Sequence, residues 1–263
     1  MNKYRIIFKY LRFLFKAKHY KGHGVHSPYV YKFVSEVIFD NSRRKDYKKA
    51  ENYRKSLLKK SDVIKVIDFG AGSKIFNTDY RKIKNIAKYS STKKKYGKLL
   101  YRIVNYCKPT NVIEFGTSLG LGTLYLALGN NKSNIYTIEA SDEVYQIASQ
   151  SIKDLNVNNV KFINNKFEDA IPEILSKLDN VEIVFFDGNH TKKATLDYFN
   201  KCLKKINNNS IFIFDDINWS KDMEQAWKTI KSNPKTKVSI DLFQFGIVLF
   251  KEELSKEHFI VRF

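Results

Sequence analysis

Apolar and polar residues alternate with two different periods along the second half of the chain. Seven short apolar runs predict β-strands, over residues 111–115, 134–139, 160–163, 181–187, 210–215, 237–242 and 245–250. Helical spacing appears between the first six runs, over residues 121–128, 143–155, 168–178, 192–205 and 221–232. The last two strands predict a hairpin, and the closing residues 258–263 fit either an added strand or an edge segment. This order predicts an α/β fold with a doubly wound, mostly parallel sheet of seven strands.

The first half of the chain begins with a basic amphipathic helical pattern over residues 1–18. A basic row follows one face at steps of four, three and four residues: Arg5, Lys9, Arg12 and Lys16. Apolar residues fall on another face: Ile7, Leu11, Leu14 and Phe15. We expect this apolar face to pack on the protein's own body. Association with a membrane surface or docking of a substrate is the alternative.

Three further segments continue this helical region. Ser27 before Pro28 predicts a helix start, with serine as the N-cap and proline at the first helical position. Residues 40–60 are a charged helical run with little apolar face, which predicts a solvated surface helix. Residues 82–106 predict one or two helices ahead of the first strand. The chain is therefore expected to divide into a basic, mainly helical region over 1–108 and an α/β domain over 109–263.

The net charge of +20 belongs to one part of the chain. Residues 1–110 contain 29 Lys and Arg against 7 Asp and Glu, whereas residues 111–263 contain 18 against 20. A basic region joined to a nearly neutral one indicates an acidic partner, such as nucleic acid, a membrane surface or an anionic substrate. The excess of lysine also fits a merely solvated face, and both interpretations stay open.

The length and the cysteine content of the chain limit the classes of protein to which it can belong. A chain of 263 residues with 43% apolar residues can bury a proper core, and no apolar run reaches the roughly 18–20 residues that span a bilayer. Lys9 and Arg12 interrupt the first apolar stretch, which argues against a secretory signal. Cys107 and Cys202 are too few for a disulfide framework or a metal cage. These features predict a cytoplasmic protein, with peripheral attachment to a membrane as an alternative.

A strand, a glycine-rich turn and a helix follow one another in the stretch NVIEFGTSLGLGTLYLA, residues 111–127. Such a turn brings the backbone and the first helical N–H groups close to a ligand. The acidic residue and the glycines stand in the order Glu114, Gly116, Gly120 and Gly122. This spacing differs from that of a dinucleotide or Walker motif. A similar segment at residues 68–73 lacks a following apolar helix, and a loop or an anion-binding nest explains it better.

An acidic residue followed by glycines at this spacing resembles the first motif of the class I S-adenosylmethionine-dependent methyltransferases. The resemblance implies a Rossmann-like sheet of seven strands, one of them antiparallel, and the predicted element order is similar. It also implies S-adenosylmethionine as the cofactor. In the small-molecule O-methyltransferases the helix before the first strand covers cofactor and substrate, and residues 82–106 occupy that place in the sequence.

Acidic residues end four of the predicted strands, and ligands of such sheets bind outside these carboxyl ends. By the resemblance, Glu139 would accept both ribose hydroxyls, Glu114 would face the amino-acid part, and Ser141 would line the ribose or adenine edge. Residues 167–169 would form the adenine rim. The complete set implied in cofactor binding is Glu114, Gly116, Thr117, Ser118, Gly120, Glu139, Ala140, Ser141, Phe167, Glu168 and Asp187.

The segments VEIVFFDGNH and SIFIFDDINW resemble the catechol and caffeoyl-CoA O-methyltransferases, which bind a divalent cation there. The corresponding positions are Asp187, Asp215 and Asp216, where Asp216 replaces the family's asparagine. The replacement keeps an oxygen ligand and still suits Mg²⁺. The alternative is that these acids only end their strands and face the cofactor. His190 stands where those enzymes carry a lysine base and, with Asp187, makes the predicted catalytic pair.

The resemblance therefore implies methyl transfer from S-adenosylmethionine to a hydroxyl of a small or lipid-like acceptor, with assistance from a divalent metal. An RNA or protein methyltransferase that uses the basic N-terminal region is the first alternative. A non-catalytic cofactor-binding or membrane-attached module is the second. Neither the acceptor nor the oligomeric state follows from the sequence.

Overall fold

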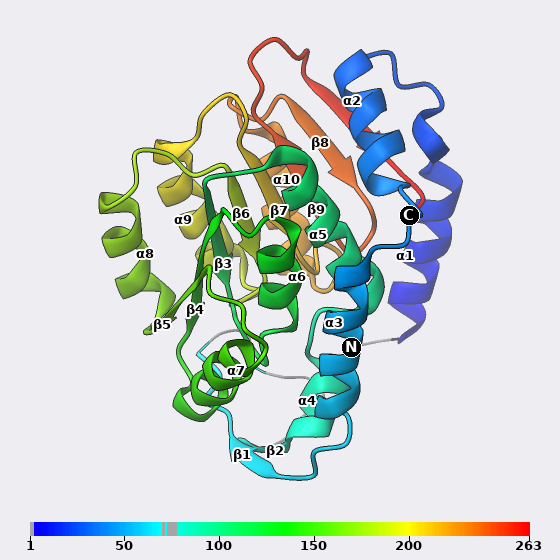
Figure 1. Ribbon diagram of the computed structural model, residues 1–263. Helices are drawn as coiled ribbons and strands as arrows, with labels where there is room; N and C mark the ends of the chain where they lie inside the picture. Colours follow the sequence, from blue (N-terminus) through cyan, green and yellow to red (C-terminus); the bar gives the residue numbers. More distant parts are fainter. Residues whose placement is uncertain (1–2, 70–71, 73–77) are drawn as a thin grey trace. The chain divides into compact units, whose positions relative to one another are not determined.

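The computed structural model describes residues 3–69, 72 and 78–263 (Figure 1). The chain forms two compact units: one comprises Met1–Asn41 and Asn180–Phe263, and the other comprises Ser42–Asp179. The boundaries of these units differ from the expected division into a helical region over 1–108 and an α/β domain over 109–263, which stays a prediction. Within the described part of the chain, no helix has the length and apolar character needed to cross a bilayer.

Three parallel strands form the sheet of the unit Ser42–Asp179. They are β3 (Asn111–Phe115), β4 (Asn134–Glu139) and β5 (Val160–Asn164), with β4 between the other two. A helix follows each strand: α6 (Leu121–Gly129), α7 (Asp142–Asp154) and α8 (Phe167–Ser176). Strand β3 is buried along nearly its whole length, as expected of a strand covered on both faces. All six elements lie within two residues of the predicted ones.

Three helices and a small antiparallel hairpin precede this sheet in the sequence. They are α3 (Lys45–Leu57), β1 (Val63–Lys65), β2 (Tyr80–Lys82), α4 (Ile83–Tyr89) and α5 (Lys94–Cys107). The hairpin was not predicted. The candidate nest at residues 68–73 follows β1, and its residues Gly70, Ala71 and Ser73 lie outside the described part of the chain.

Helix α3 is not the solvated surface helix that its lysines predicted. It buries four residues of one face: Tyr47, Ala50, Tyr53 and Leu57. These positions follow one another at steps of three and four, so they form an apolar stripe among charged neighbours. The prediction was wrong because the stripe depends on two tyrosines, whose rings can be buried although their hydroxyls are polar.

Helix α5 packs very closely on α6. A Cβ added at Gly97 would lie 2.3 Å from ring atoms of Tyr125, a fully buried side chain. Only glycine allows the two helices to approach at this point. The segment predicted as a cover for the cofactor is thus, within its own unit, the packing partner of the helix that follows the glycine-rich turn.

Five strands form the sheet of the other unit, in the order β10-β8-β9-β7-β6. They are β6 (Ile183–Phe186), β7 (Ile211–Phe214), β8 (Val238–Asp241), β9 (Gly246–Leu249) and β10 (Glu257–Ile260). The pair β6–β7 is parallel, β9 runs antiparallel to β7 and β8, and β10 is parallel to β8. The predicted hairpin is therefore confirmed. Apart from the hairpin of β1 and β2, the described residues of the two units hold eight strands, β3 to β10, rather than the seven predicted. The additional strand is β10, which the closing residues of the chain form at an edge.

Helices connect these strands and precede them. Strand β6 leads to α9 (Lys192–Cys202) with its extension η3 (Leu203–Lys205), and β7 leads to α10 (Lys221–Ser232). The N-terminal helices of this unit are α1 (Lys3–Lys16), η1 (Tyr20–Gly22), α2 (Pro28–Phe33) and the π-helical turn η2 (Val34–Ile38). Helix α2 begins as predicted, since Ser27 Oγ accepts a hydrogen bond from Val30 N at 3.4 Å.

Helix α1 contradicts the expectation for its apolar face. Ile7, Leu11 and Phe15 are exposed rather than packed on the protein's body. The physical reason is that the helix buries a different face, which carries Phe13 and the charged residues Arg5 and Lys9.

Candidate functional site

The turn between β3 and α6 is shaped by residues with positive φ. They are Gly116 (φ 94°), Ser118 (φ 48°) and Gly120 (φ 74°). The N–H groups of Gly116 and Thr117 both donate to the Ile138 carbonyl at 3.1 Å, which fastens the turn to the end of β4. Left-handed backbone favours glycine, so the two glycines are the residues that permit this path.

Glu114 lies at the end of β3 with 1% of its surface exposed. Its Oε2 accepts hydrogen bonds from Thr123 Oγ1 at 2.5 Å and from Thr137 Oγ1 at 2.7 Å. Burial raises the pKa of Glu114 to about 7, with a further contribution from the charge of Glu139. The carboxyl group therefore ties β3 to α6 and β4. Its role toward the amino-acid part of a cofactor stays a prediction.

Glu139 ends β4, and backbone N–H groups hold both of its carboxylate oxygens. Oε2 accepts a hydrogen bond from Ser118 N at 2.9 Å, and Oε1 accepts one from Ser141 N at 3.0 Å. Burial raises the pKa of Glu139, while the N–H groups of Ser141, Ser118 and Ala140 act in the opposite direction. An ionised carboxylate offers about four lone-pair sites, so this one is held in a fixed orientation and keeps acceptor capacity for hydroxyl donors.

The side chain of Ser141 contacts a segment that sequence reasoning did not connect with it. Its Oγ accepts a hydrogen bond from Ile67 N at 3.1 Å and donates one to the Lys65 carbonyl at 3.3 Å. Lys65 N also donates to Glu143 Oε2 at 2.9 Å. These bonds fasten β1 to the start of α7. The predicted contact of Ser141 with ribose or adenine stays a prediction.

The same connection brings Asp68 close to the predicted cofactor residues. The charge of Asp68 is one cause of the raised pKa of Glu139. Next to it, the Phe69 ring lies 5.2 Å from Lys166 Nζ. Sequence reasoning set this segment aside because no apolar helix follows it. Its acidic residue after a short apolar run was the signal that could have kept it as a candidate.

Phe167 and Glu168 begin α8. The Phe167 ring meets the Phe115 ring edge-on, with centroids 5.5 Å apart, which ties the helix start to the end of β3. Glu168 is exposed. The unit Ser42–Asp179 thus holds every predicted cofactor residue except Asp187, on the segments that follow β3, β4 and β5.

Tyr53 of α3 also supports the glycine-rich turn. Its hydroxyl donates a hydrogen bond to the Leu119 carbonyl at 2.7 Å. Burial raises the pKa of Tyr53 to about 12, so the hydroxyl remains a donor at any physiological pH. Sequence reasoning missed this contact because nothing in a lysine-rich helix points to a loop far along the chain.

Asp187 and His190 lie together in the loop after β6, in the other unit. His190 Nε2 is 3.8 Å from Asp187 Oδ1, within ion-pair distance when the imidazole is protonated. Asn189 between them has a φ of 48°, and its Nδ2 lies 3.1 Å from the Tyr198 hydroxyl of α9, to which it donates a hydrogen bond. This left-handed turn places the two ionisable side chains of the predicted catalytic pair next to each other.

Asp215 follows β7 and is buried. Its Oδ1 accepts hydrogen bonds from Asp216 N at 2.7 Å and from Gln244 Nε2 at 3.1 Å. A side-chain hydrogen bond joins Asp215 to Asp187, so the acids that end β6 and β7 meet as predicted. Burial is the main cause that raises the pKa of Asp215, and the charge of Asp216 raises it further. The raised pKa favours a proton shared between Asp215 and Asp187. Gln244 in the β8–β9 hairpin was not among the predicted site residues.

The donor set of Asp187, Asp215 and Asp216 has the chemistry that Mg²⁺ prefers. Across residues 3–69, 72 and 78–263, however, no group of three or more His, Cys, Asp or Glu side chains is arranged to hold a metal ion. Two of the three acids are hydrogen-bonded to each other. The arrangement therefore does not fit a metal as it stands, and the metal-binding role stays a prediction.

Residues 113–217 match a family model described as a methyltransferase domain. This stretch of the chain is similar to a methyltransferase domain. The matched range contains all predicted site residues, from Glu114 to Asp216. The resemblance inferred from the glycine spacing is confirmed by this match.

Solved structures of methyltransferases share the fold of most of this chain. An O-methyltransferase from Bacillus cereus in complex with SAH is 19% identical, with 84% of this chain and 97% of that chain covered and a TM-score of 0.56. The SAH-bound methyltransferase PaMTH1 from Podospora anserina is 15% identical, with coverage of 86% and 97% and a TM-score of 0.58. TomG from Streptomyces achromogenes, an O-methyltransferase of tomaymycin synthesis in complex with SAM, is 15% identical, with coverage of 84% and 95% and a TM-score of 0.55. The predicted Rossmann-like fold is confirmed.

Two curated relatives match shorter stretches. An uncharacterized RNA methyltransferase from Clostridium tetani is 31% identical over 75 residues, which are 28% of this chain and 16% of that protein. The uncharacterized protein R132 of Acanthamoeba polyphaga mimivirus is 29% identical over 124 residues, which are 43% of this chain and 56% of that protein. The matches thus span about a sixth and about half of the length of these relatives.

Proposed function

We propose that this chain transfers a methyl group from S-adenosylmethionine to a hydroxyl of a small or lipid-like acceptor. The family match and the fold shared with SAH- and SAM-bound O-methyltransferases support this activity. The observation that carries the proposal is the Glu139 carboxylate, which two backbone N–H groups orient at the end of β4. Because it retains acceptor capacity, it can receive the hydroxyl donors of a ribose.

The residues around Glu139 would hold the rest of the methyl donor. The backbone of Gly116 and Gly120 permits close approach of a ligand, and the Phe167 ring offers an apolar edge to an adenine. The bound donor supplies an activated methyl group on a sulfonium. The protein's main contribution is then to position the acceptor hydroxyl, because positioning provides a large part of the acceleration in such a transfer.

His190 is the proposed base. Its imidazole would accept the proton of the acceptor hydroxyl as the oxygen takes the methyl group. Asp187, 3.8 Å from His190 Nε2, would stabilise the resulting imidazolium and keep the ring oriented. Divalent-metal assistance through Asp187, Asp215 and Asp216 remains a separate prediction, and the proposed proton transfer does not depend on it.

The alternatives inferred from the sequence remain testable. The short match to an RNA methyltransferase keeps RNA as a second acceptor class, since the first 110 residues are strongly basic. Retention of the chain on RNA at low salt, and its steep loss at high salt, would favour that acceptor. A non-catalytic module would bind the cofactor without any turnover.

Transfer of a labelled methyl group to a panel of phenolic, catecholic and sugar hydroxyl acceptors tests the proposal. For His190→Gln we expect kcat to fall by about 100-fold or more, with the affinity for S-adenosylhomocysteine unchanged, because a general base acts only in the chemical step. His26→Gln is the matched control, since His26 is exposed and lies in the loop before α2.

Three outcomes are decisive. Equal kcat values for His190→Gln and the parent chain would exclude His190 as the base. Full activity in EDTA, together with full activity of Asp215→Ala, would exclude the predicted metal. Methyl transfer to RNA but to none of the hydroxyl compounds would replace the proposed acceptor.

A further inference from the structure

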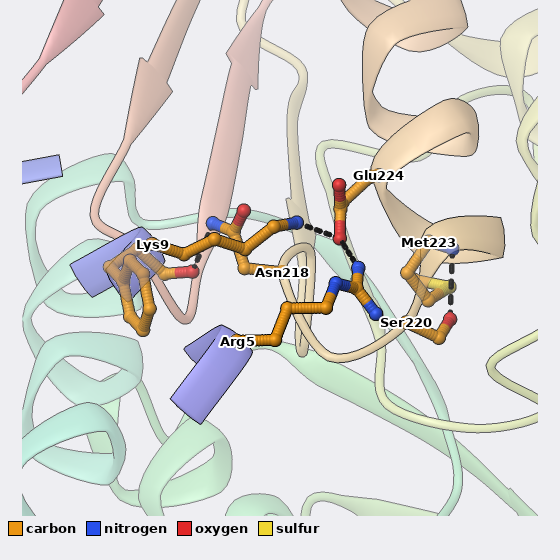
Figure 2. Close-up of polar contacts among 7 residues, drawn as sticks. Arg5, Lys9, Asn218, Ser220, Met223 and Glu224 are labelled. Atoms are coloured by element: carbon orange, nitrogen blue, oxygen red, sulfur yellow. Dashed lines mark hydrogen bonds and ion pairs between the residues drawn. The ribbon is translucent and has the colours of Figure 1, made fainter. Parts of the chain in front are cut away.

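Helix α1 is attached to its unit by its basic face. Figure 2 shows Arg5 and Lys9 of α1 pointing together toward Glu224 of α10, and both side chains form ion pairs with Glu224 Oε1. On the same side of the helix, the Phe13 ring lies 5.3 Å from the Phe243 ring, centroid to centroid. The Glu224 carboxylate therefore compensates part of the charge of Arg5 and Lys9, and the helix turns its other faces outward.

The outward face of α1 is apolar. Four large side chains are exposed on it: Ile7 (56%), Phe8 (68%), Leu11 (49%) and Phe15 (85%). At 3.6 residues per turn these four positions fall within an arc of about 100°. Large apolar side chains scattered singly over a surface are ordinary, whereas four in one continuous stripe mark an interaction surface.

A basic edge borders this stripe. At helical spacing Arg12 falls next to Phe8. Lys16 falls further round, in line with Arg5 and Lys9 but at the end of the helix, and both Arg12 and Lys16 are exposed. Residues 1–35 contain eight Lys and Arg and no Asp or Glu. An apolar stripe with cations along its edge, in a segment without acidic residues of its own, is complementary to a lipid bilayer with an apolar interior and negatively charged headgroups.

We propose that α1 binds in the plane of an anionic lipid bilayer, with Ile7, Phe8, Leu11 and Phe15 below the headgroups and Arg12 and Lys16 at the level of the phosphates. The contact of Arg5 and Lys9 with Glu224 fixes the orientation of the helix, so the apolar stripe already faces outward in the free protein. This pre-orientation lowers the ordering cost of binding.

Other occupants fit this surface less well. A second copy of the chain would bring two basic edges together without an acid to compensate them, and like charges at close range oppose association. Nucleic acid would pair with Arg12 and Lys16, but its phosphates offer nothing to the apolar stripe between residues 7 and 15. Of these three occupants, the bilayer satisfies both parts of the surface.

Co-sedimentation of the full chain with vesicles tests the proposal. We expect binding to vesicles of phosphatidylcholine mixed with phosphatidylglycerol, and much weaker binding to phosphatidylcholine alone. The double variant Phe8→Ser, Phe15→Ser should lose at least about tenfold in partition coefficient, because each exposed ring contributes apolar area to the bilayer contact. The double variant Arg12→Gln, Lys16→Gln should lose about fivefold per charge at low salt.

Tyr80→Ser is the matched control, since this aromatic residue of β2 is 62% exposed but lies in the other unit. It should bind vesicles like the parent chain. None of these residues belongs to the proposed methyl-transfer machinery, so all variants should bind S-adenosylhomocysteine equally, which also verifies their folding. A failure of the membrane proposal therefore leaves the proposed activity untouched.

Three results would overturn the proposal. The first is equal binding of the parent chain and the Phe8→Ser, Phe15→Ser variant to anionic vesicles. The second is equal binding of the parent chain to vesicles with and without phosphatidylglycerol. The third is a dimer in light scattering that this variant dissociates, with no vesicle binding, which would make a second copy the occupant of the stripe.

Discussion

Glu114 and Glu139 end neighbouring strands, and their partners give them different tasks. Side-chain hydroxyls on α6 and β4 surround the carboxyl group of Glu114 inside the unit, whereas backbone N–H groups hold Glu139 and leave it acceptor capacity. Both residues were predicted from their positions at strand ends. The sequence could not tell a structural carboxyl group from a binding one, because that difference depends on Thr137 and Ser118, whose approach follows from strand register and turn geometry.

Stability should depend on pH through Glu114. Its pKa rises from the ordinary value of 4.5 to about 7 in the folded protein, so the folded state holds this proton more tightly than the unfolded chain. The contribution of Glu114 to the free energy of unfolding is therefore largest below about pH 4.5, and it falls by roughly 1–3 kcal/mol as the pH rises through about 7.

Glu114→Gln should remove this part of the pH dependence. Urea unfolding of the parent chain and of Glu114→Gln, each at about pH 5 and about pH 8, measures this effect. The quantity compared is the shift of the unfolding midpoint between the two pH values in each protein. The parent chain should lose more stability than the variant over this interval. Identical losses would show that Glu114 carries its charge in the folded protein as it does in the unfolded chain.

At the scale of elements, the regular strands and helices of the second half followed from periodicity, whereas the partners of irregular segments did not. Each predicted helix from α6 to α10 was found, because apolar residues recur at helical spacing in these segments. The buried stripe of α3 and the hairpin of β1 and β2 were missed. The contacts that stabilise them, such as Ser141 Oγ with Lys65 and Ile67, join segments far apart in the sequence.

Gly97 provides a test of the packing between α5 and α6. In a helix interior, alanine is more favourable than glycine by about 1 kcal/mol, so Gly97→Ala would stabilise an isolated helix. Here the new Cβ would lie 2.3 Å from the buried Tyr125 ring, and overpacking of this kind costs about 1–3 kcal/mol. We expect a net loss of stability in urea unfolding. A gain would mean that the two helices separate easily at this point.

At the scale of the whole molecule, the net charge of +20 overstates the surface available to an acidic partner. Several cations of the first half are used internally: Arg5 and Lys9 with Glu224, Lys94 and Lys98 with Glu51, and Arg54 with the carbonyls of Ala87 and Thr92. The sequence correctly indicated that α1 is basic and amphipathic. It did not predict which face is turned outward, since an ion pair with Glu224 decides this.

Glu139 is the proposed anchor of the methyl donor. Calorimetric titration with S-adenosylhomocysteine tests it most directly, on the parent chain, on Glu139→Ala and on the matched control Glu173→Ala, an exposed carboxylate of α8. Loss of a carboxylate that receives ribose hydroxyls should weaken binding by about tenfold or more, since hydrogen bonds to charged groups contribute about 1.5–3 kcal/mol. We predict one binding site in the parent chain and in Glu173→Ala, and clearly weaker binding in Glu139→Ala. Equal affinity of all three proteins, or no binding to the parent chain, would contradict the account.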